Sequence, residues 1–319
     1  MKGNYSPPPR VSVLVVTYNH AQHIAQCLDS ILCQKTNFPF EIVLGEDGSN
    51  DGTQEICKEY AKRFPDVIRL GIRDQKKKVY LYGRATGKYN LLKVMQEGRG
   101  DYFAFCDGDD YWTDKKKLQK QVDFMTANQS FSFCSTDRRV LKDGVIFRDE
   151  RIQTAFAKNN GTPIVITKHN FFNPYLVKTN TILFRRDCLD FELLQERYTE
   201  VKDTFIYYML LNKGDGVVQP WITSDYRIHQ GGRWSSLSRF GAARMNHHTI
   251  RGMYLSYLGA DAEVRNIYCG SLFKYLITSV KNKQWRDARI ALTESPFLLL
   301  KKLITRGLRK IFRSSKAVG

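Results

Sequence analysis

The sequence predicts an α/β fold built on a parallel sheet, and three observations support this prediction. Strand-like and helix-like segments alternate four times over about the first hundred residues, as successive βαβ units do. The first segment, "VSVLVVTYN" at 11–19, is a run rich in β-branched residues, typical of a strand buried on both faces. Hydrophobic residues make up 42% of the 319 positions, which is enough for a substantial core.

The elements of this first part follow from hydrophobic spacing and from residues that break helices. Pro65 ends the second predicted helix, and Gly98 closes the third. In chain order we predict a strand at 11–19, a helix at 21–34, a strand and turn at 40–53, a helix at 53–64, a strand at 67–73, a helix at 88–98, a strand with an acidic end at 101–110 and a helix at 115–127.

The pattern is weaker in the second half of the chain. Residues 130–185 predict short strands and loops, and 187–214 predict mostly helix. A strand is expected to start at 217, and the sequence from about 240 onward is helical and increasingly basic. No internal repeat and no long low-complexity linker interrupts the chain.

An excess of basic residues indicates an anionic partner. Lysine and arginine total 50 against 32 acidic residues, which gives a formal charge of +18. Nucleic acid, a phosphorylated ligand and a membrane surface all fit this balance. No nucleic-acid recognition motif accompanies the charge, so we expect no nucleic-acid partner.

The seven cysteines indicate a reducing compartment. Their number is odd and no two form a C-x-x-C pair, so we expect free thiols without a disulfide framework or zinc site. The N-terminus "MKGNYSPPPR" lacks the apolar segment of a signal peptide. No apolar run approaches the roughly 20 residues that span a bilayer. We therefore expect a cytoplasmic protein.

Three polar clusters follow predicted strands: "TYN" at 17–19, "GEDGS" at 45–49 and "DGDD" at 107–110. Ligands of α/β sheets bind beyond the carboxyl ends of the strands, so these clusters should meet at one edge of the sheet. Closely packed carboxylates are most easily tolerated around a divalent cation, and hard oxygen ligands favour Mg²⁺ or Mn²⁺. Tyr111 and Trp112 beside the acidic cluster can wall a pocket.

Three other interpretations of motifs in the sequence fail on spacing or position. The stretch "DGSNDGT" resembles the start of a calcium-binding loop, but the twelfth position, a glutamate in such loops, is Lys58. The stretch "GRATGK" at 83–88 has one residue too few between its glycines for a P-loop. A phosphatase of the haloacid dehalogenase type would carry its D-x-D pair near the N-terminus.

In order and spacing, the three clusters resemble a family 2 glycosyltransferase with the GT-A fold. The family has a first strand that ends in T-Y-N, matched by Thr17, Tyr18 and Asn19. A second strand ends in D-D-x-S-x-D-x-T, matched by "EDGSNDGT" with Glu46 for the first aspartate and Asp47 for the second. Its D-x-D is matched by Asp107-Gly108-Asp109, and the sequel "DDYWTDKKKLQKQVDF" resembles a bacterial subgroup that makes surface polysaccharide or lipopolysaccharide.

The resemblance implies a donor and metal site. Tyr18 and Asp47 would hold the nucleotide base, with the Asp47 carboxylate accepting the N–H of a uracil or thymine ring. Lys88, where the family often has arginine, would contact the nucleotide or its phosphates. Asp109, helped by Asp107, would bind Mg²⁺ or Mn²⁺ on the diphosphate, and a late histidine, His229 in "YRIH", would complete that site. Thr17, Asn19, Glu46 and Gly108 complete the implied nucleotide site.

The resemblance also implies an inverting single displacement, in which a carboxylate takes the proton of the acceptor hydroxyl. The family places this base in an E-D pair at a helix start well after the D-x-D, a place taken here by Asp203. Lys202 stands where the usual neighbour is acidic or small, and Glu200 is the second candidate for the base. The implied function is sugar transfer from a nucleoside diphosphate donor, UDP being favoured, to a glycan or lipid-linked acceptor. A non-catalytic module that binds nucleotide or glycan is the alternative.

The predicted organisation is a tail at 1–10, a GT-A domain at 11–232 and a basic helical extension at 233–319. Residues 295–316 alternate apolar and basic positions in an amphipathic pattern. This segment predicts either a helix packed on the protein or attachment to an anionic membrane surface, where a lipid-linked acceptor would lie.

Overall fold

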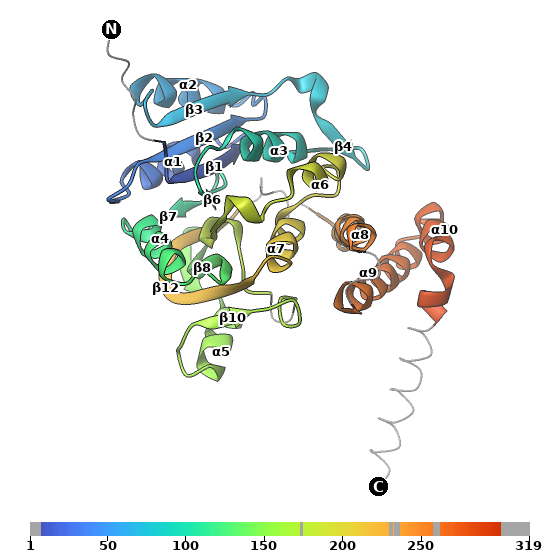
Figure 1. Cartoon of the computed structure of the whole chain (residues 1–319). Helices are drawn as coiled ribbons and strands as arrows, with labels where there is room; N and C mark the ends of the chain where they lie inside the picture. Colours follow the sequence, from blue (N-terminus) through green and yellow to red (C-terminus); the bar gives the residue numbers. More distant parts are fainter. Residues whose placement is uncertain (1–7, 173–174, 230–231, 233–236, 258–261, 301–319) are drawn as a thin grey trace. The chain divides into compact units, whose positions relative to one another are not determined.

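The computed structural model describes residues 8–172, 175–229, 232, 237–257 and 262–300. Figure 1 traces the chain, which divides after His229 into two compact units, Met1–His229 and Gln230–Gly319. The first unit contains the sheet and the three polar clusters of the sequence.

One large sheet forms the centre of the first unit. Its strands are β1 (Val11–Thr17), β2 (Phe40–Glu46), β3 (Ile68–Ile72), β6 (Tyr102–Phe105), β7 (Tyr111–Trp112), β8 (Phe131–Lys142), β9 (Val145–Arg148), β10 (Ile164–Ile166), β11 (Leu183–Arg185) and β12 (Asp215–Ile228). Their order is β10-β12-β8-β11-β6-β1-β2-β3, with β7 paired to β12 and β9 paired to β8. The short strands β4 (Val79–Leu81) and β5 (Arg84–Thr86) form a separate hairpin.

The N-terminal strands are parallel, as the alternation of strands and helices predicts. β1 pairs in parallel with β2 and β6, and β2 pairs in parallel with β3. The "TYN", "GEDGS" and "DGDD" clusters follow the carboxyl ends of β1, β2 and β6, so they share one edge of the sheet. The predicted α/β fold is confirmed.

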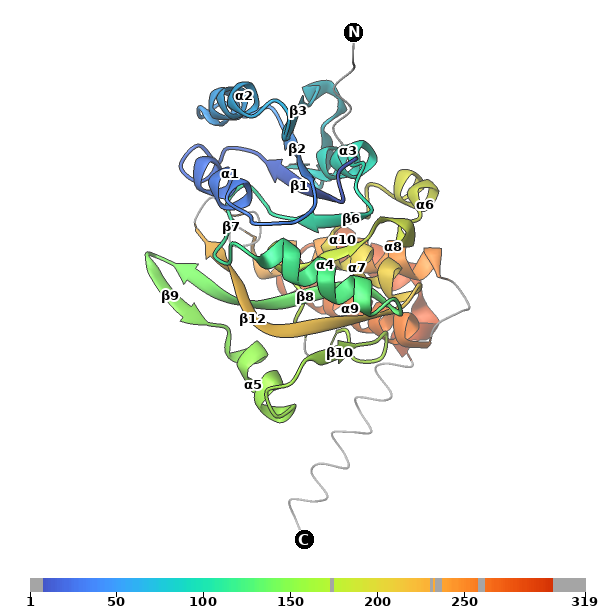
Figure 2. The ribbon, with the colours of Figure 1, turned by 60° about the vertical axis from the view of Figure 1, so that its left-hand side comes forward.

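Helices cover both faces of this part of the sheet (Figures 1 and 2). The helices of the first unit are α1 (Ile24–Leu32), α2 (Thr53–Arg63), α3 (Lys88–Glu97), α4 (Lys117–Ala127), α5 (Glu150–Lys158), α6 (Phe191–Glu196) and α7 (Asp203–Leu211). Apolar side chains of α1, α2 and α4 share one core with alternate residues of β1 and β2. On the other face, Asn90 of α3 donates a hydrogen bond to the carbonyl of Gly45 in β2 (2.8 Å).

The expectation of short strands and loops over 130–185 is wrong for two elements. β8 is a strand of 12 residues, and α5 is a helix. β8 has no apolar alternation because its middle buries polar side chains, several of which bond to partners outside the strand. The hydroxyl of Thr136 meets that of Thr223 at 2.6 Å, and Arg138 donates to Asp149 at 2.7 Å. The region 187–214, predicted to be mostly helical, contains α6 and α7, which a short non-helical segment separates.

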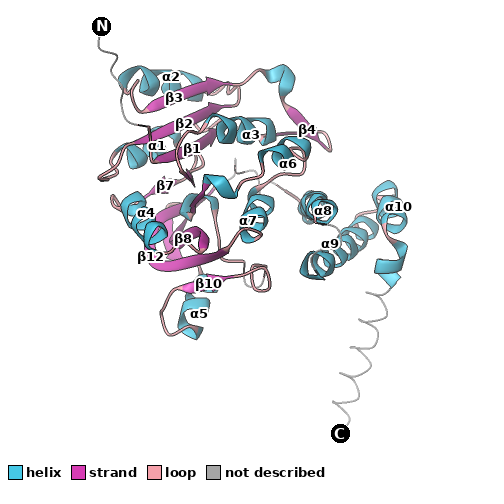
Figure 3. Ribbon diagram, in the orientation of Figure 1, coloured by secondary structure: helices cyan, strands magenta, loops and turns pink. Residues whose placement is uncertain are grey.

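The second unit is helical in its described part (Figure 3). It contains α8 (Arg239–Ser256), α9 (Ala262–Lys281) and α10 (Trp285–Glu294), which surround a core of their own. None of the helices in the described residues is long and apolar enough to cross a membrane. Of the amphipathic segment 295–316, the residues from 301 onward lie outside the described part.

Candidate active site at the carboxyl edge of the sheet

The acidic turn after β6 places its three carboxylates in different surroundings. Asp107 accepts a hydrogen bond from the Thr179 hydroxyl (2.8 Å). Asp110 is buried and accepts from the backbone N–H of Arg227 (2.7 Å). Burial raises the pKa of Asp110 well above its usual range, and the neighbouring charges of Asp109 and Asp107 act in the same direction. Asp110 thus fastens the turn to β12.

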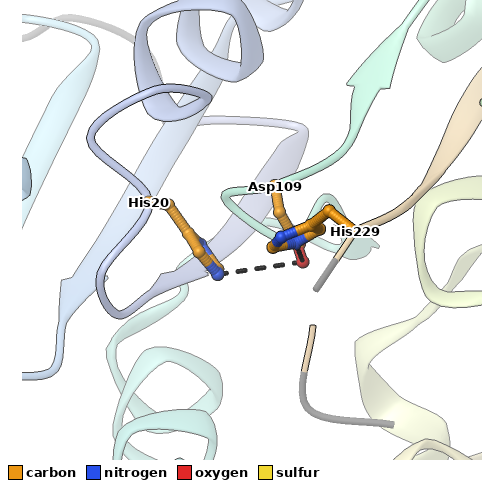
Figure 4. Close-up of side chains that lie close together, drawn as sticks. All are labelled: His20, Asp109 and His229. Carbon is orange, nitrogen blue, oxygen red and sulfur yellow. Dashed lines mark hydrogen bonds and ion pairs between the residues drawn. The ribbon is translucent and has the colours of Figure 1, made fainter. Parts of the chain in front are cut away.

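Asp109 lies beside two histidines (Figure 4). Its Oδ2 is 3.1 Å from Nε2 of His229 and 3.7 Å from Nε2 of His20. Burial opposes ionisation of Asp109, but the hydrogen bond with His229 and the nearby His20 hold the pKa of this carboxyl below its usual value. The ligand atoms of the three residues all lie within 4.8 Å of one another, and no other such group of potential metal ligands occurs in the described residues.

Three separate segments bring this cluster together. His20 lies in the turn after β1, where its backbone N–H donates to the Thr53 hydroxyl (2.8 Å) at the start of α2. Gly108 leaves no room for a side chain, since a Cβ there would lie 2.6 Å from the Thr17 hydroxyl oxygen. His229 follows the last residue of β12. The sequence reasoning named Asp109 and His229 but missed His20, which stands directly after the "TYN" motif.

The "TYN" and "EDGS" turns hold each other through hydrogen bonds. Glu46 is buried and accepts from the backbone N–H groups of Gly48 (3.1 Å) and Ser49 (2.7 Å). The backbone N–H of Asn19 donates to the Ser49 hydroxyl (2.9 Å), and its side-chain oxygen accepts from the backbone N–H of Asn50 (3.1 Å). Glu46 and Asn19 therefore shape the two turns, and this role does not depend on a ligand.

Asp47 and Tyr18 come together around a lysine that sequence reasoning missed. The ammonium of Lys78 lies 3.3 Å from Oδ2 of Asp47 and 3.7 Å from the centre of the Tyr18 ring. Lys78 and Asp47 are buried side chains, whereas Tyr18 is exposed and can present its ring to a planar ligand. Lys78 ends the run "KKK", and nothing in that run separates it from its two solvent-exposed neighbours.

Lys88 has a structural contact in addition to its predicted role. It is the first residue of α3, is buried, and donates to the carbonyl of Val201 (2.5 Å). Val201 lies two residues before the predicted base. Lys88 thus fixes the segment that leads into α7, and its contact with a nucleotide stays a prediction.

Asp203 is the first residue of α7, as predicted for the base at a helix start. Its Oδ1 accepts from the backbone N–H of Thr204 (2.7 Å), and its Oδ2 accepts from the Tyr175 hydroxyl (3.3 Å). Lys202 lies 3.9 Å from Oδ1. Glu200 accepts from the hydroxyl of Thr199 (2.7 Å) in the preceding turn.

Tyr226 of β12 is influenced by the charges of both the acidic turn and Asp203 at the start of α7. Burial raises the pKa of its hydroxyl, and the carboxylates that add to this effect are Asp110, Asp109, Asp107 and Asp203. The ammonium of Lys178 lies 5.2 Å from the Tyr226 ring centre and 5.8 Å from that of Tyr175, which contacts Asp203. The candidate base and the candidate metal ligands therefore share one electrostatic environment.

Comparisons with known proteins identify the fold and the family of the chain. An uncharacterised protein of Mycobacterium tuberculosis is 28% identical over 233 residues, which cover 71% of this chain and 61% of the relative. This chain therefore matches less than two thirds of that relative's length.

Two solved structures share the fold. TarS of S. aureus, in complex with UDP-GlcNAc, has a TM-score of 0.54 at 16% identity and covers 90% of this chain and 91% of its own. A mannosyltransferase of Pyrobaculum calidifontis, in complex with GDP-Man and Mn²⁺, has a TM-score of 0.52 at 17% identity over 98% and 87% of the two chains.

The sheet and its flanking helices are thus those of GT-A glycosyltransferases. The family model described as "Glycosyl transferase family 2" matches residues 12–190, more than half of the chain. By this match the chain belongs to glycosyl transferase family 2.

Proposed function

We propose that the protein is an inverting glycosyltransferase that moves a sugar from a UDP-linked donor to a glycan or lipid-linked acceptor. The observation that carries this proposal is the meeting of Asp109 and His229 at the same sheet edge as the Asp47–Tyr18 pair. Asp109 and His229 supply ligands for a metal on the donor diphosphate. Asp47 and Tyr18 supply a carboxylate and an aromatic ring for the nucleotide base.

The donor's base is read by Asp47 and Tyr18 in this proposal. A buried carboxylate is an acceptor only, so it selects a base with a ring N–H such as uracil. The exposed ring of Tyr18 offers a face for stacking. Lys78 keeps the Asp47 side chain in place through its ion pair, and Lys88, the first residue of α3, would contact the nucleotide or its phosphates. Thr17, Asn19, Glu46 and Gly108 support this site by shaping its turns.

The residues fit a divalent cation. Asp109 and His229 are directed toward each other, and Asp107 belongs to the same turn. A carboxylate combined with imidazole suits Mn²⁺, and carboxylate oxygens alone suit Mg²⁺. When bound, such a cation would neutralise the charge that develops on the departing nucleoside diphosphate. Asp107, Asp109 and His229 are the residues that would hold it.

Asp203 is the proposed general base. Its position at the start of α7 and the hydrogen bonds from Thr204 and Tyr175 fix the carboxylate while leaving part of it exposed to solvent. From there it takes the proton of the acceptor hydroxyl as that oxygen attacks the sugar carbon from the side opposite the diphosphate. Inversion follows from this single displacement.

The setting of the reaction is also a proposal. The lipid-linked or glycan acceptor belongs to a surface-polysaccharide or lipopolysaccharide pathway, and the enzyme works in the cytoplasm. The basic amphipathic segment 295–316 holds it at an anionic membrane surface.

The test measures both binding and turnover. We expect a UDP-sugar, with Mn²⁺, to raise the unfolding temperature and to be slowly hydrolysed or transferred to an added acceptor. A matched panel of GDP- and dTDP-sugars, each with Mn²⁺ and with chelator, defines the base and the metal requirement. Donor binding without any hydrolysis or transfer would favour the non-catalytic module instead. Absence of binding by any nucleotide would refute both.

A further inference from the structure

We propose that His20 is a fourth protein ligand of the metal site, beside Asp107, Asp109 and His229, and that its imidazole, paired with that of His229, makes the site select Mn²⁺ over Mg²⁺. This inference rests on the metal site proposed above. It concerns a residue outside the D-x-D turn and outside the late "YRIH" motif. The reasons are the placement of the ring, its orientation and the chemistry of its nitrogen.

The placement of the three side chains fits a shared cation. Protein ligands stand about 2.1 Å from such metals, so neighbouring ligand atoms are about 3 Å apart and opposite ones about 4.2 Å apart. Oδ2 of Asp109 is 3.1 Å from Nε2 of His229 and 3.7 Å from Nε2 of His20. Both separations lie within that range, and Figure 4 shows the His20 and His229 rings converging on the same carboxylate.

The orientation of His20 directs Nε2 toward Asp109. Nδ1 of His20 lies 3.2 Å from the Thr17 hydroxyl oxygen, which can accept the Nδ1–H. When Nδ1 carries the only ring proton, the Nε2 lone pair faces the Asp109 carboxylate, which is also an acceptor. Two acceptors that face each other are stabilised by a cation between them. Metal-bound histidines commonly donate their second N–H to an oxygen in this way, which fixes the ring.

The surroundings hold the His20 backbone and ring in place. The Thr53 hydroxyl that receives the His20 N–H donates in turn to Oδ1 of Asp51 (2.6 Å). On the other side, a Cβ at Gly108 would lie 3.0 Å from Nδ1 of His20, so the acidic turn packs directly against the ring. The ligand is therefore positioned before any metal arrives, which reduces the ordering needed on binding.

The donor set decides which metal is preferred. Imidazole nitrogen suits transition metals, whereas Mg²⁺ prefers oxygen ligands and keeps several of its waters. One imidazole beside carboxylates gives the site a mild preference for Mn²⁺ over Mg²⁺, and a second imidazole strengthens this preference. We therefore expect His20 to contribute affinity for Mn²⁺ and little affinity for Mg²⁺.

His23 provides a matched control three residues along the chain. Its ring centre is 5.0 Å from that of His229, but His23 does not belong to the Asp109 cluster. Removal of His23 therefore changes the histidine content and the packing near the site without removing a proposed ligand. His20→Asn is the informative substitution, because it replaces the nitrogen donor by an amide that offers oxygen.

The experiment measures metal binding directly, without turnover. Mn²⁺ is titrated into the full chain with UDP present and followed by electron paramagnetic resonance. Mg²⁺ competition gives the Mn²⁺/Mg²⁺ ratio, and spin-echo modulation reports the directly bound imidazole nitrogens. Circular dichroism verifies that each variant is folded. We expect two coupled imidazoles in the wild type and in His23→Ala, and one in His20→Ala and His20→Asn.

In the same titration we expect His20→Ala to weaken Mn²⁺ binding by at least about tenfold, since loss of even an outer partner of a metal ligand costs about that much. His20→Asn should lower the Mn²⁺/Mg²⁺ ratio. If both His20 variants keep two coupled imidazoles and wild-type Mn²⁺ affinity while Asp109→Ala loses binding, the inference about His20 is wrong and the metal site stands. If Asp109→Ala also binds Mn²⁺ as the wild type does, the proposed metal site itself is refuted.

Discussion

The ammonium of Lys78 lies 3.3 Å from Oδ2 of Asp47, and both side chains are at least 95% buried. The same ammonium donates to the Asp47 carbonyl (2.8 Å) and lies 3.7 Å from the centre of the exposed Tyr18 ring. One basic side chain from the segment after β3 thus positions the two residues proposed to hold the nucleotide base.

We expect Asp47→Ala to weaken UDP binding by about ten- to a hundredfold, because a hydrogen bond to a charged group contributes about 1.5–3 kcal/mol. Calorimetric titration with UDP measures this loss. The substitution also leaves Lys78 without its carboxylate, so stability must be measured in parallel by denaturant unfolding. The single variants Lys78→Met and Asp47→Asn and the double variant that combines them measure the coupling of the two side chains. The double variant should lose less free energy of unfolding than the sum of the losses in the two single variants. Unchanged UDP affinity in folded Asp47→Ala would mean that the "EDGS" turn is only structural.

Glu41 in β2 makes stability depend on pH. Its carboxylate is buried, which by itself would raise its pKa, but hydrogen bonds from Arg99 and Ser12 hold the pKa below the usual 4.5. A group with a lowered folded pKa stabilises the protein fully above the unfolded value, and this stabilisation is lost as the pH falls through the folded value. We expect Glu41→Gln to destabilise the protein at pH 7 by about 1.5–3 kcal/mol and to reduce the loss of stability in acid. Denaturant unfolding at neutral and acidic pH measures both. The exposed Glu59→Gln is the control, and equal behaviour of the two variants would contradict this role.

Most of the N-terminal half of the fold could be predicted from the sequence. β1, β2 and β6 are mostly apolar runs, and their helices have regular apolar spacing, so local pattern sufficed. β8 was missed because Thr136 and Arg138 are buried through partners on other segments, which no local pattern reveals. A strand that satisfies its polar side chains across the sheet has no hydrophobic alternation to read.

In the candidate site too, residues within local motifs were predicted, and residues that depend on tertiary contacts were missed. Asp109 and His229 were predicted because each belongs to a recognisable motif. His20 and Lys78 were missed because their roles depend on tertiary contacts. His20 acquires its role only when the acidic turn packs against the turn after β1, and Lys78 only when its segment folds back over Asp47. Proximity to a motif was the one available signal for His20.

Lys88→Met separates two roles for one lysine. The ammonium donates to the carbonyl of Val201, two residues before Asp203. We therefore expect this substitution to lower the rate of transfer more than the affinity for UDP, because it loosens the segment that positions the proposed base. Steady-state kinetics and UDP titration on the same preparation make the comparison. A tenfold or larger loss of UDP affinity with an unchanged rate at saturation would instead place Lys88 on the nucleotide, as the sequence predicted.

The last prediction concerns Asp203 and decides between enzyme and binding module. A general base acts only as the acceptor hydroxyl attacks, so its removal should affect the transition state far more than the binding of donor. Asp203→Asn keeps the shape of the side chain, and its amide oxygen can still accept from the backbone N–H of Thr204. We expect the variant to bind UDP and Mn²⁺ nearly normally and to lose transfer by about 10²–10⁴-fold. Glu200→Gln, three residues earlier, is the matched control and should stay near the wild-type rate. A collapse in Glu200→Gln with a normal rate in Asp203→Asn would move the role to Glu200, and normal rates in both would show that the base lies outside the start of α7.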